Sequence, residues 1–295
     1  MANLPADHRS RMEHVRLAVD GLWTGDSLGE RFFYPSARML LHWREPPSPP
    51  WPHTDDTEMA LAIAEVLGVH RRIDQDELAR LFARRYHLDP GRGYGGTAHQ
   101  ILARIHMGVP WQDAAGEAFD GEGSMGNGAA MRVAPVGAYF ADNYERTAVE
   151  ARKSAEVTHA HAEGKAGAIA VAVASAWACR HGAGERSEGM LETVLAYTPP
   201  SETRDKVERA LTLREDFDVA GAASLLGNGS RVIAQDTVPF ALWCAARHLG
   251  DFEGALWATI SVFGDIDTNC AIVGGIVALA TGRQGIPKAW LQARE

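Results

Sequence analysis

The chain has 295 residues, of which 46% are hydrophobic and 23% charged, as is normal for a packed globular protein with a sizeable core. Its formal net charge of −9 and the lack of a basic stripe exclude general binding to the phosphate backbone of nucleic acids. The longest run of small apolar residues, 166–179, is shorter than a membrane span, and the charged N-terminus lacks the apolar core of a secretion signal. We expect no membrane partner.

The chain contains three cysteines, an odd number. Cys179, Cys244 and Cys270 each lie in an apolar stretch that is typical of a helix interior. Such cysteines are expected to be reduced core thiols in a reducing compartment, so we expect a cytoplasmic protein.

Helical periodicity recurs along almost the whole chain, whereas β-branched alternation is nearly absent. The pattern predicts helices over 10–22, 56–68, 76–87, 143–157, 164–180, 236–248 and 268–281. The proline-rich segment 44–51 is too short for an interdomain linker and is typical of a rigid loop. With no internal repeat and no shift in composition, we expect one all-α domain over residues 1–295.

Two adjacent carboxylates, Asp55 and Asp56, lie between threonines at the expected start of the second of these helices. The simplest interpretation is a helix cap, with Thr54 or Asp55 as the N-cap residue and acids favoured by the helix dipole. That interpretation suffices if no other part of the chain needs these oxygens.

A second acidic cluster, about two hundred residues later, repeats this chemistry. Asp265, Asp267 and Thr268 lead directly into the last of the predicted helices. Together with Thr54, Asp55 and Asp56 they make an all-oxygen set, which suits Mg²⁺ or Mn²⁺ better than zinc. Four carboxylates in one place would repel one another unless one or, better, two divalent ions were bound. Two unrelated capped helices remain the alternative.

Two familiar motifs are incomplete. GEGSMG at 121–126 fits the dinucleotide pattern, but no apolar strand precedes it. The segment 265–269 begins like a calcium loop, yet Cys270 and Ile276 stand where the turn glycine and the bidentate glutamate are required. Neither a Rossmann site nor an EF-hand is expected.

Five segments occur in the order found in ADP-ribosylglycohydrolases, and the chain resembles this family from about residue 15 to near its C-terminus. These segments are GLWTGDSLG at 21–29, TDDT at 54–57, GSMGNGAAMRVAP at 123–135, TH at 158–159 and GDIDTN at 264–269. The resemblance implies an orthogonal all-α bundle with two Mg²⁺ or Mn²⁺ ions, which hydrolyses the bond between the distal ribose of ADP-ribose and its acceptor. The implied metal ligands are Thr54, Asp55, Asp56, Asp265, Asp267 and Thr268.

The resemblance also gives a role to the glycine-rich segment. Gly123, Ser124, Gly126, Asn127 and Gly128 could cradle a pyrophosphate with backbone N–H groups, although an ordinary loop is the alternative. His159 is the expected contact to phosphate or ribose. In the flexible segment 93–97, Tyr94 could stack on a ring of the substrate, or the segment could be a plain turn. Arg132 is expected in a buried ion pair.

The family commonly places a catalytic glutamate several residues after the first motif, where this chain has Phe33. Glu30, directly after Gly29, is the alternative general base; otherwise it is a surface residue paired with Arg31. Together with Asp55 and Asp267, Glu30 completes the expected catalytic set. Asp26 is expected to be a structural acid or a partner of the ligands, and His53 a partner of a carboxylate. Ile266, where the family often has threonine, should point away from the ions.

The leading hypothesis is therefore a metal-dependent ADP-ribosyl hydrolase whose partner is a substrate bearing ADP-ribose, such as a modified protein. Two alternatives stay open. One is a dinuclear phosphoesterase that cleaves the pyrophosphate, and the other is a relative that binds ADP-ribose without turnover. The acceptor, which could be arginine, serine, a nucleic-acid end or a small molecule, does not follow from the sequence.

Overall fold

The fold is all-α, as expected. The computed structural model describes residues 7–184, 188–214 and 216–295. In these ranges the only β contacts are two isolated bridges, Trp51 with Arg294 and Gly126 with Ile233. The α-helices are α1 (His8–Arg31), α2 (Pro35–Leu41), α3 (Asp55–His70), α4 (Gln75–Leu88), α5 (Gly96–His106), α6 (Trp111–Gly116), α7 (Gly128–Met131), α8 (Ala134–Tyr139), α9 (Tyr144–Glu156), α10 (Ala162–His181), α11 (Glu188–Tyr197), α12 (Glu202–Leu211), α13 (Val219–Leu226), α14 (Ala234–Arg247), α15 (Phe252–Ile260), α16 (Ile266–Thr281) and α17 (Lys288–Ala293).

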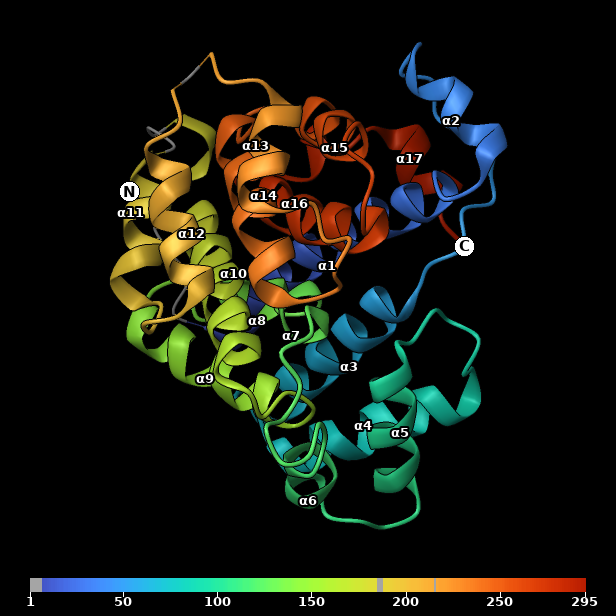
Figure 1. The fold of residues 1–295 in the computed structure, drawn as a ribbon, viewed down its shortest axis with the longest axis vertical. Coiled ribbons are helices and arrows are strands. Elements are labelled where there is room, and N and C mark those ends of the chain that lie inside the picture. The colour runs from blue at the N-terminus through green and yellow to red at the C-terminus, as the bar shows by residue number, and fades with distance from the viewer. Residues whose placement is uncertain (1–6, 185–187, 215) are drawn as a thin grey trace.

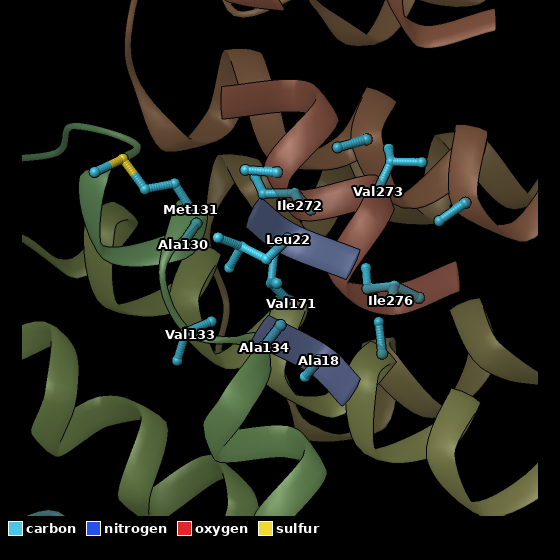
Figure 2. Packing of buried hydrophobic residues seen from close by; sticks show 14 of the residues in the cluster. Ala18, Leu22, Ala130, Met131, Val133, Ala134, Val171, Ile272, Val273 and Ile276 are labelled. Atoms are coloured by element: carbon cyan, nitrogen blue, oxygen red, sulfur yellow. The ribbon is translucent and has the colours of Figure 1, made fainter. Parts of the chain in front are cut away.

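Three long helices, α1, α10 and α16, form the centre of the molecule (Figure 1). Leu22 of α1, Val171 of α10 and Ile272 of α16 are fully buried in one hydrophobic cluster (Figure 2). α10 is rich in alanine and buried along most of its length, so its neighbours can approach its backbone closely. Helices α4, α5 and α6 lie at the opposite end of the molecule from α2 and α17 (Figure 1).

Three glycines spaced by four residues let α1 approach α16. A Cβ atom added to Gly21 would lie 2.3 Å from the carbonyl oxygen of Gly274, and one added to Gly25 would lie 2.0 Å from that of Cys270. At Gly29 the added atom would lie 2.8 Å from the Cα atom of Asp267. Only glycine permits this backbone contact, and the contact brings the end of α1 against the start of α16.

This packing explains where the prediction of the first helix was wrong. The predicted helix ended at residue 22, whereas α1 continues to Arg31. Glycine weakens an isolated helix by about 1 kcal/mol relative to alanine. Here burial against α16 outweighs that propensity, since residues 24–29 of α1 are all buried. The other six predicted helices agree with the structure to within two residues at each end.

The sequence also predicts reduced core cysteines, a proline-rich loop and no membrane span. Cys244 and Cys270 are buried and Cys179 is half-buried, and all three are free thiols. Segment 45–50 has no helix and leads to the buried Trp51, whose backbone pairs with the C-terminal segment. Among the described residues, no helix combines the length and the apolar character that crossing a bilayer requires.

Candidate active site

The first acidic cluster begins helix α3. Thr54 is the N-cap residue, and its hydroxyl oxygen accepts a hydrogen bond from the backbone N–H of Asp56 at 3.3 Å. Asp55 and Asp56 follow in the first turn, where the helix dipole favours negative charge. Both carboxylates are nevertheless buried, with exposed fractions of 8% and 1%. A cap alone does not account for two buried carboxylates, because capping acids are normally solvated.

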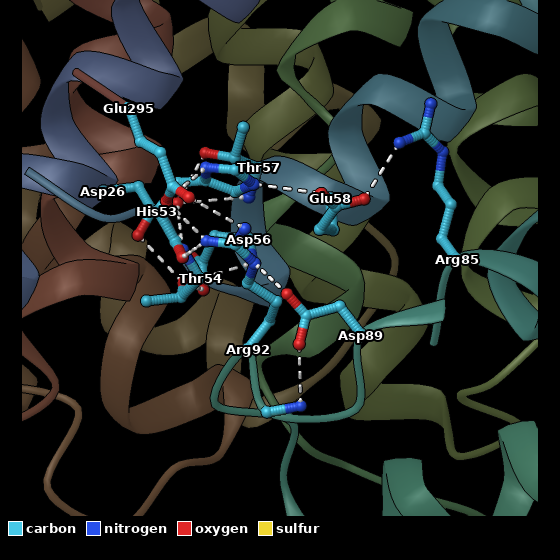
Figure 3. A network of polar contacts seen from close by, with 11 residues as sticks. Asp26, His53, Thr54, Asp56, Thr57, Glu58, Arg85, Asp89, Arg92 and Glu295 are labelled. Atoms are coloured by element: carbon cyan, nitrogen blue, oxygen red, sulfur yellow. Dashed lines mark hydrogen bonds and ion pairs between the residues drawn. The ribbon is translucent and has the colours of Figure 1, made fainter. Parts of the chain in front are cut away.

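Asp26, on the glycine-rich face of α1, connects that helix to the start of α3 (Figure 3). Its carboxylate accepts hydrogen bonds from the backbone N–H of Thr54 at 3.0 Å and from the Thr54 hydroxyl at 2.8 Å. The Thr57 hydroxyl donates to the same carboxylate at 2.5 Å. Asp26 is fully buried, so these donors replace the water that a carboxylate would otherwise bind.

The second acidic cluster, at the start of α16, meets the first. Three carboxylate oxygens all lie within 4.8 Å of one another, and they come from Asp26, Asp56 and Asp267. The Thr268 hydroxyl lies 3.5 Å from a carboxylate oxygen of Asp56. The structure therefore brings together residues from α1, α3 and α16, and Asp26 lies beside the expected ligands, as its expected role as their partner requires.

The acids in this cluster hold protons more tightly than ordinary carboxyl groups. Burial, followed by the charge of Asp267, raises the pKa of Asp56 well above its usual value. Burial, followed by the charge of Asp265, does the same to the pKa of Asp267. Burial and then Asp26 raise the pKa of Asp55 to about 8. These raised pKa values have one common cause, which is that several carboxylates lie close together away from water.

The donor set fits a hard divalent cation. One carboxylate oxygen of Asp56, Oδ1, is buried and has no hydrogen-bond partner. An unpartnered buried carboxylate oxygen is costly unless a cation or water satisfies it. All the converging atoms are carboxylate or hydroxyl oxygens, the ligands that Mg²⁺ and Mn²⁺ prefer.

A cavity of about 610 Å³ opens beside the acidic cluster. Asp55, Asp56, Asp265, Asp267 and Thr268 line it at the acidic end. The remaining wall includes segments 95–98, 122–128 and 231–233, together with single residues from neighbouring loops and helices. This is large enough for a nucleotide-sized molecule.

All the residues expected in the glycine-rich cradle, and His159, line this cavity. The expected backbone donors are largely occupied, however. The N–H of Gly123 donates to Ala118, that of Gly126 to the Ser124 hydroxyl, and that of Asn127 to Val232. The glycines instead make room for a neighbouring ring, since a Cβ added to Gly128 would lie 3.1 Å from the ring of His159.

The side chain of Asn127 points to the acids. Its amide nitrogen donates to a carboxylate oxygen of Asp265 at 2.6 Å and to the Thr237 hydroxyl at 3.0 Å. This bond orients Asp265, and the sequence had suggested only a backbone role for Asn127.

Tyr94 does not line the cavity, in contrast to the stacking role expected for it. It is 5% exposed, and its ring packs edge-on against Tyr86 at 5.2 Å between ring centroids. The ring belongs to the hydrophobic core, whereas the neighbouring Gly93 and Gly95 line the cavity.

Arg132 is buried but forms no ion pair with any described residue, so the expected buried ion pair is wrong. Its guanidinium donates to the carbonyl oxygen of Ser154 at 2.9 Å and to the Thr158 hydroxyl at 2.8 Å, and it lies over the ring of Phe82. These neutral partners, together with the negative field of Asp55, stabilise the charge in place of a contacting carboxylate.

Glu30 lies on the last turn of α1, half-buried and outside the wall of the cavity. Burial, and then the charge of Asp26, raise its pKa. Phe33, at the offset where the family commonly has glutamate, is 38% exposed. His53 is bonded to Glu58 at 3.0 Å, which confirms its expected position beside a carboxylate, although not beside a member of the acidic cluster (Figure 3).

Part of the cavity wall could not be predicted from the sequence. Arg231, Val232 and Ile233 reach the cavity from the loop before α14, and Met59 reaches it from the second turn of α3. No motif marks these residues, because their place depends on how α14 packs against the central helices.

The chain is similar to several known proteins. The sequence profile described as ADP-ribosylglycohydrolase matches residues 7–295. The chain is 31% identical to ADP-ribosylhydrolase ARH3 from Bos taurus, over 82% of this chain and 74% of that protein. The match to ADP-ribosylhydrolase ARH3 from Homo sapiens has the same identity and the same two coverages. A solved structure, described as an ADP-ribosylglycohydrolase-related protein complex, superimposes with a TM-score of 0.71 at 27% identity, over 97% of this chain and 93% of that one.

Proposed function

The chain belongs to the ADP-ribosylglycohydrolase family, and from this premise we propose that it is a metal-dependent hydrolase of the bond between the distal ribose of ADP-ribose and its acceptor. One observation carries the proposal. Carboxylates that are buried on α1 and α3 and half-buried at the start of α16 converge at one end of a nucleotide-sized cavity, with an unpartnered oxygen among them.

We assign the cation ligands to Thr54, Asp55, Asp56, Asp265, Asp267 and Thr268, for two Mg²⁺ or Mn²⁺ ions. Bound divalent cations supply Lewis acidity, which polarises oxygen groups and lowers the pKa of water. The protein contributes the orientation of these ligands. Asp26 holds Thr54 and Thr57 by hydrogen bonds, and Asn127 holds Asp265.

In the proposed reaction, water adds its oxygen to C1 of the distal ribose while the bond from C1 to the acceptor breaks. The acceptor leaves with the electron pair of that bond and takes up a proton. Such cleavage passes through an oxocarbenium-like state, which nearby carboxylates such as Asp55 and Asp267 stabilise. Glu30, on the last turn of α1 and outside the cavity wall, is assigned as the group that accepts the proton from water and returns it to the leaving acceptor. Its raised pKa brings it nearer the neutral range in which a general base is efficient.

Product analysis tests the proposal. The protein is incubated with ADP-ribosyl-arginine and ADP-ribosyl-serine peptides, in Mg²⁺ and then in chelator, and the nucleotides are separated by chromatography. Free ADP-ribose released only with Mg²⁺ supports the proposal, and the peptide that reacts defines the linkage. AMP would instead identify a phosphoesterase acting on the pyrophosphate. Tight ADP-ribose binding without release from either peptide would favour a binding protein.

A further inference from the structure

The buried arginine identified above begins a short chain of hydrogen bonds that ends in the cavity. Arg132 follows α7 and is fully buried, and one of its terminal nitrogens donates to the Thr158 hydroxyl oxygen at 2.8 Å. The Thr158 hydroxyl in turn lies 2.7 Å from Nδ1 of His159. Thr158 is 2% exposed, so water does not compete for these contacts.

The chemistry of arginine fixes the direction of every bond in this chain. A guanidinium has only donors, so the Thr158 oxygen must accept from Arg132. Nδ1 of His159 is the only other described partner of the Thr158 hydroxyl, so the hydroxyl hydrogen is satisfied only if it is donated to that nitrogen. Nδ1 therefore acts as an acceptor, which places the imidazole hydrogen on Nε2.

The opposite arrangement is disfavoured on two grounds. A hydrogen on Nδ1 would leave the buried Thr158 hydroxyl hydrogen without an acceptor. A doubly protonated ring is also disfavoured, because burial and then the charge of Arg132 lower the pKa of His159 to about 3.

The ring orientation is fixed by packing. A Cβ atom added to Gly126 would lie 3.2 Å from Nε2 of His159, and one added to Gly164 would lie 3.0 Å from its Cβ atom. The Nε2 edge thus faces loop 126–128, which lines the cavity. No described residue forms a hydrogen bond with Nε2, so this donor is left for a molecule in the cavity.

We propose that Arg132 and Thr158 are positioning residues that hold His159 as a neutral Nε2–H donor for a phosphate oxygen of the substrate. This inference deepens the proposed function and rests on it for the identity of the ligand. The tautomer of His159, by contrast, can be measured without any substrate.

The tautomer is read from ¹⁵N chemical shifts of the imidazole nitrogens in the full chain, with His159→Gln used to assign the signal. The wild type should carry its hydrogen on Nε2 throughout pH 6–8. Thr158→Ser, which keeps the hydroxyl, should preserve this state. Thr158→Val and Arg132→Met should shift His159 toward a mixture of tautomers. A hydrogen on Nδ1 in the wild type, or the same Nε2 tautomer in all four proteins, would overturn the proposal.

Calorimetric titration with ADP-ribose gives the functional readout. Thr158→Val should weaken binding about tenfold, whereas Thr158→Ser should bind as the wild type does. Thr147→Val is the matched control, because Thr147 is also a fully buried threonine but donates to Phe140 and Asn143 outside the cavity. Equal loss in Thr147→Val and Thr158→Val would overturn the positioning role.

The two claims fail in different ways. If the wild type shows the Nε2–H tautomer but does not bind ADP-ribose, the proposed function is wrong while the hydrogen-bond chain stands. If ADP-ribose binds but Thr158→Val binds equally well, the positioning role is wrong while the function stands. Should Thr158→Val fail to fold, Thr158→Ala removes the same hydroxyl with less bulk and answers the same question.

Discussion

Asp26 and Thr54 are joined by two hydrogen bonds, from the Thr54 backbone N–H at 3.0 Å and from its hydroxyl at 2.8 Å. These bonds link the C-terminal part of α1 to the residue that caps α3. The bonds fix the Thr54 hydroxyl, one of the proposed ligands, and they place a buried charge beside Asp56 and Asp267. Asp26 therefore determines the shape of the acidic cluster whether or not it touches an ion.

Asp26→Asn should retain the fold but lose about 10- to 100-fold in Mn²⁺ affinity, a typical cost of losing a residue that orients metal ligands. The asparagine amide cannot accept from all of the donors now bound to Asp26, and it removes one negative charge. Isothermal titration with Mn²⁺ measures the effect, with Asp113→Asn on the exposed surface of α6 as the control. Wild-type affinity in Asp26→Asn would refute this role.

Gly25→Ala should destabilise the protein by about 2–4 kcal/mol and weaken Mn²⁺ binding, because overpacking forces α1 away from α16. The added methyl carbon would lie 2.0 Å from the carbonyl oxygen of Cys270. Chemical denaturation gives the free energy of unfolding. Gly116→Ala is the control, since an added Cβ there has no neighbour within 4 Å, and its stability should be unchanged or slightly raised. Equal stability of the two variants would contradict the packing described for α1.

The metal-free protein should lose stability between about pH 4 and pH 8. The usual pKa of Asp55 is 3.8, and in the folded chain it is raised to about 8. A raised pKa means that the folded state binds the proton more tightly than the unfolded state, so this contribution is fully present below pH 3.8 and is lost as the pH rises through about 8. Asp56 and Asp267, also raised, act in the same direction.

Asp55→Asn isolates this effect. In chelator, the Tm of the variant relative to the wild type should increase steadily from pH 5 to pH 8, because the variant has no charge to bury at this position. Differential scanning calorimetry at several pH values measures the difference, and saturating Mg²⁺ should stabilise the wild type more than the variant. A difference in Tm that does not change with pH would show that Asp55 is not the group responsible.

The sequence was informative where a residue's role is local. The start of α3 follows from a cap and an apolar run, and that of α16 from its apolar run, so the acids at both starts could be identified. The continuation of α1 through Gly25 and Gly29 could not be predicted, because its stability comes from contact with α16, far along the chain. The same contact places Asp26 beside Asp56 and Asp267, in agreement with its expected role as a partner of the ligands.

The cradle shows a similar limit. A glycine-dense loop predicts a close approach of something to the backbone, and the structure identifies that neighbour as the ring of His159. Tyr94 lies one residue from the cavity wall yet points into the core. Which way a side chain turns in a loop depends on the packing around it, and no periodicity in the sequence encodes that choice.

Glu30→Gln should lower kcat by about 10²- to 10⁴-fold, the usual contribution of a general base, with little effect on stability. Glu30 makes no ion pair with a described residue, so its replacement removes no structural bond. The pair with Arg31, which was the alternative expected from the sequence, is not observed. ADP-ribose release is the assay, and Glu13→Gln, which alters an exposed glutamate on the same helix, is the control. An unchanged kcat in Glu30→Gln would place the base elsewhere.

The central claim is that carboxylates from distant parts of the chain hold divalent cations at the acidic end of the cavity. The most direct test is anomalous diffraction from crystals grown with Mn²⁺, for the wild type and for Asp267→Ala. We predict two anomalous peaks bounded by the oxygens of Asp55, Asp56, Asp265 and Asp267 in the wild type, with at least one lost in the variant. No peak at this cluster in wild-type crystals, or peaks only at surface acids, would contradict the account.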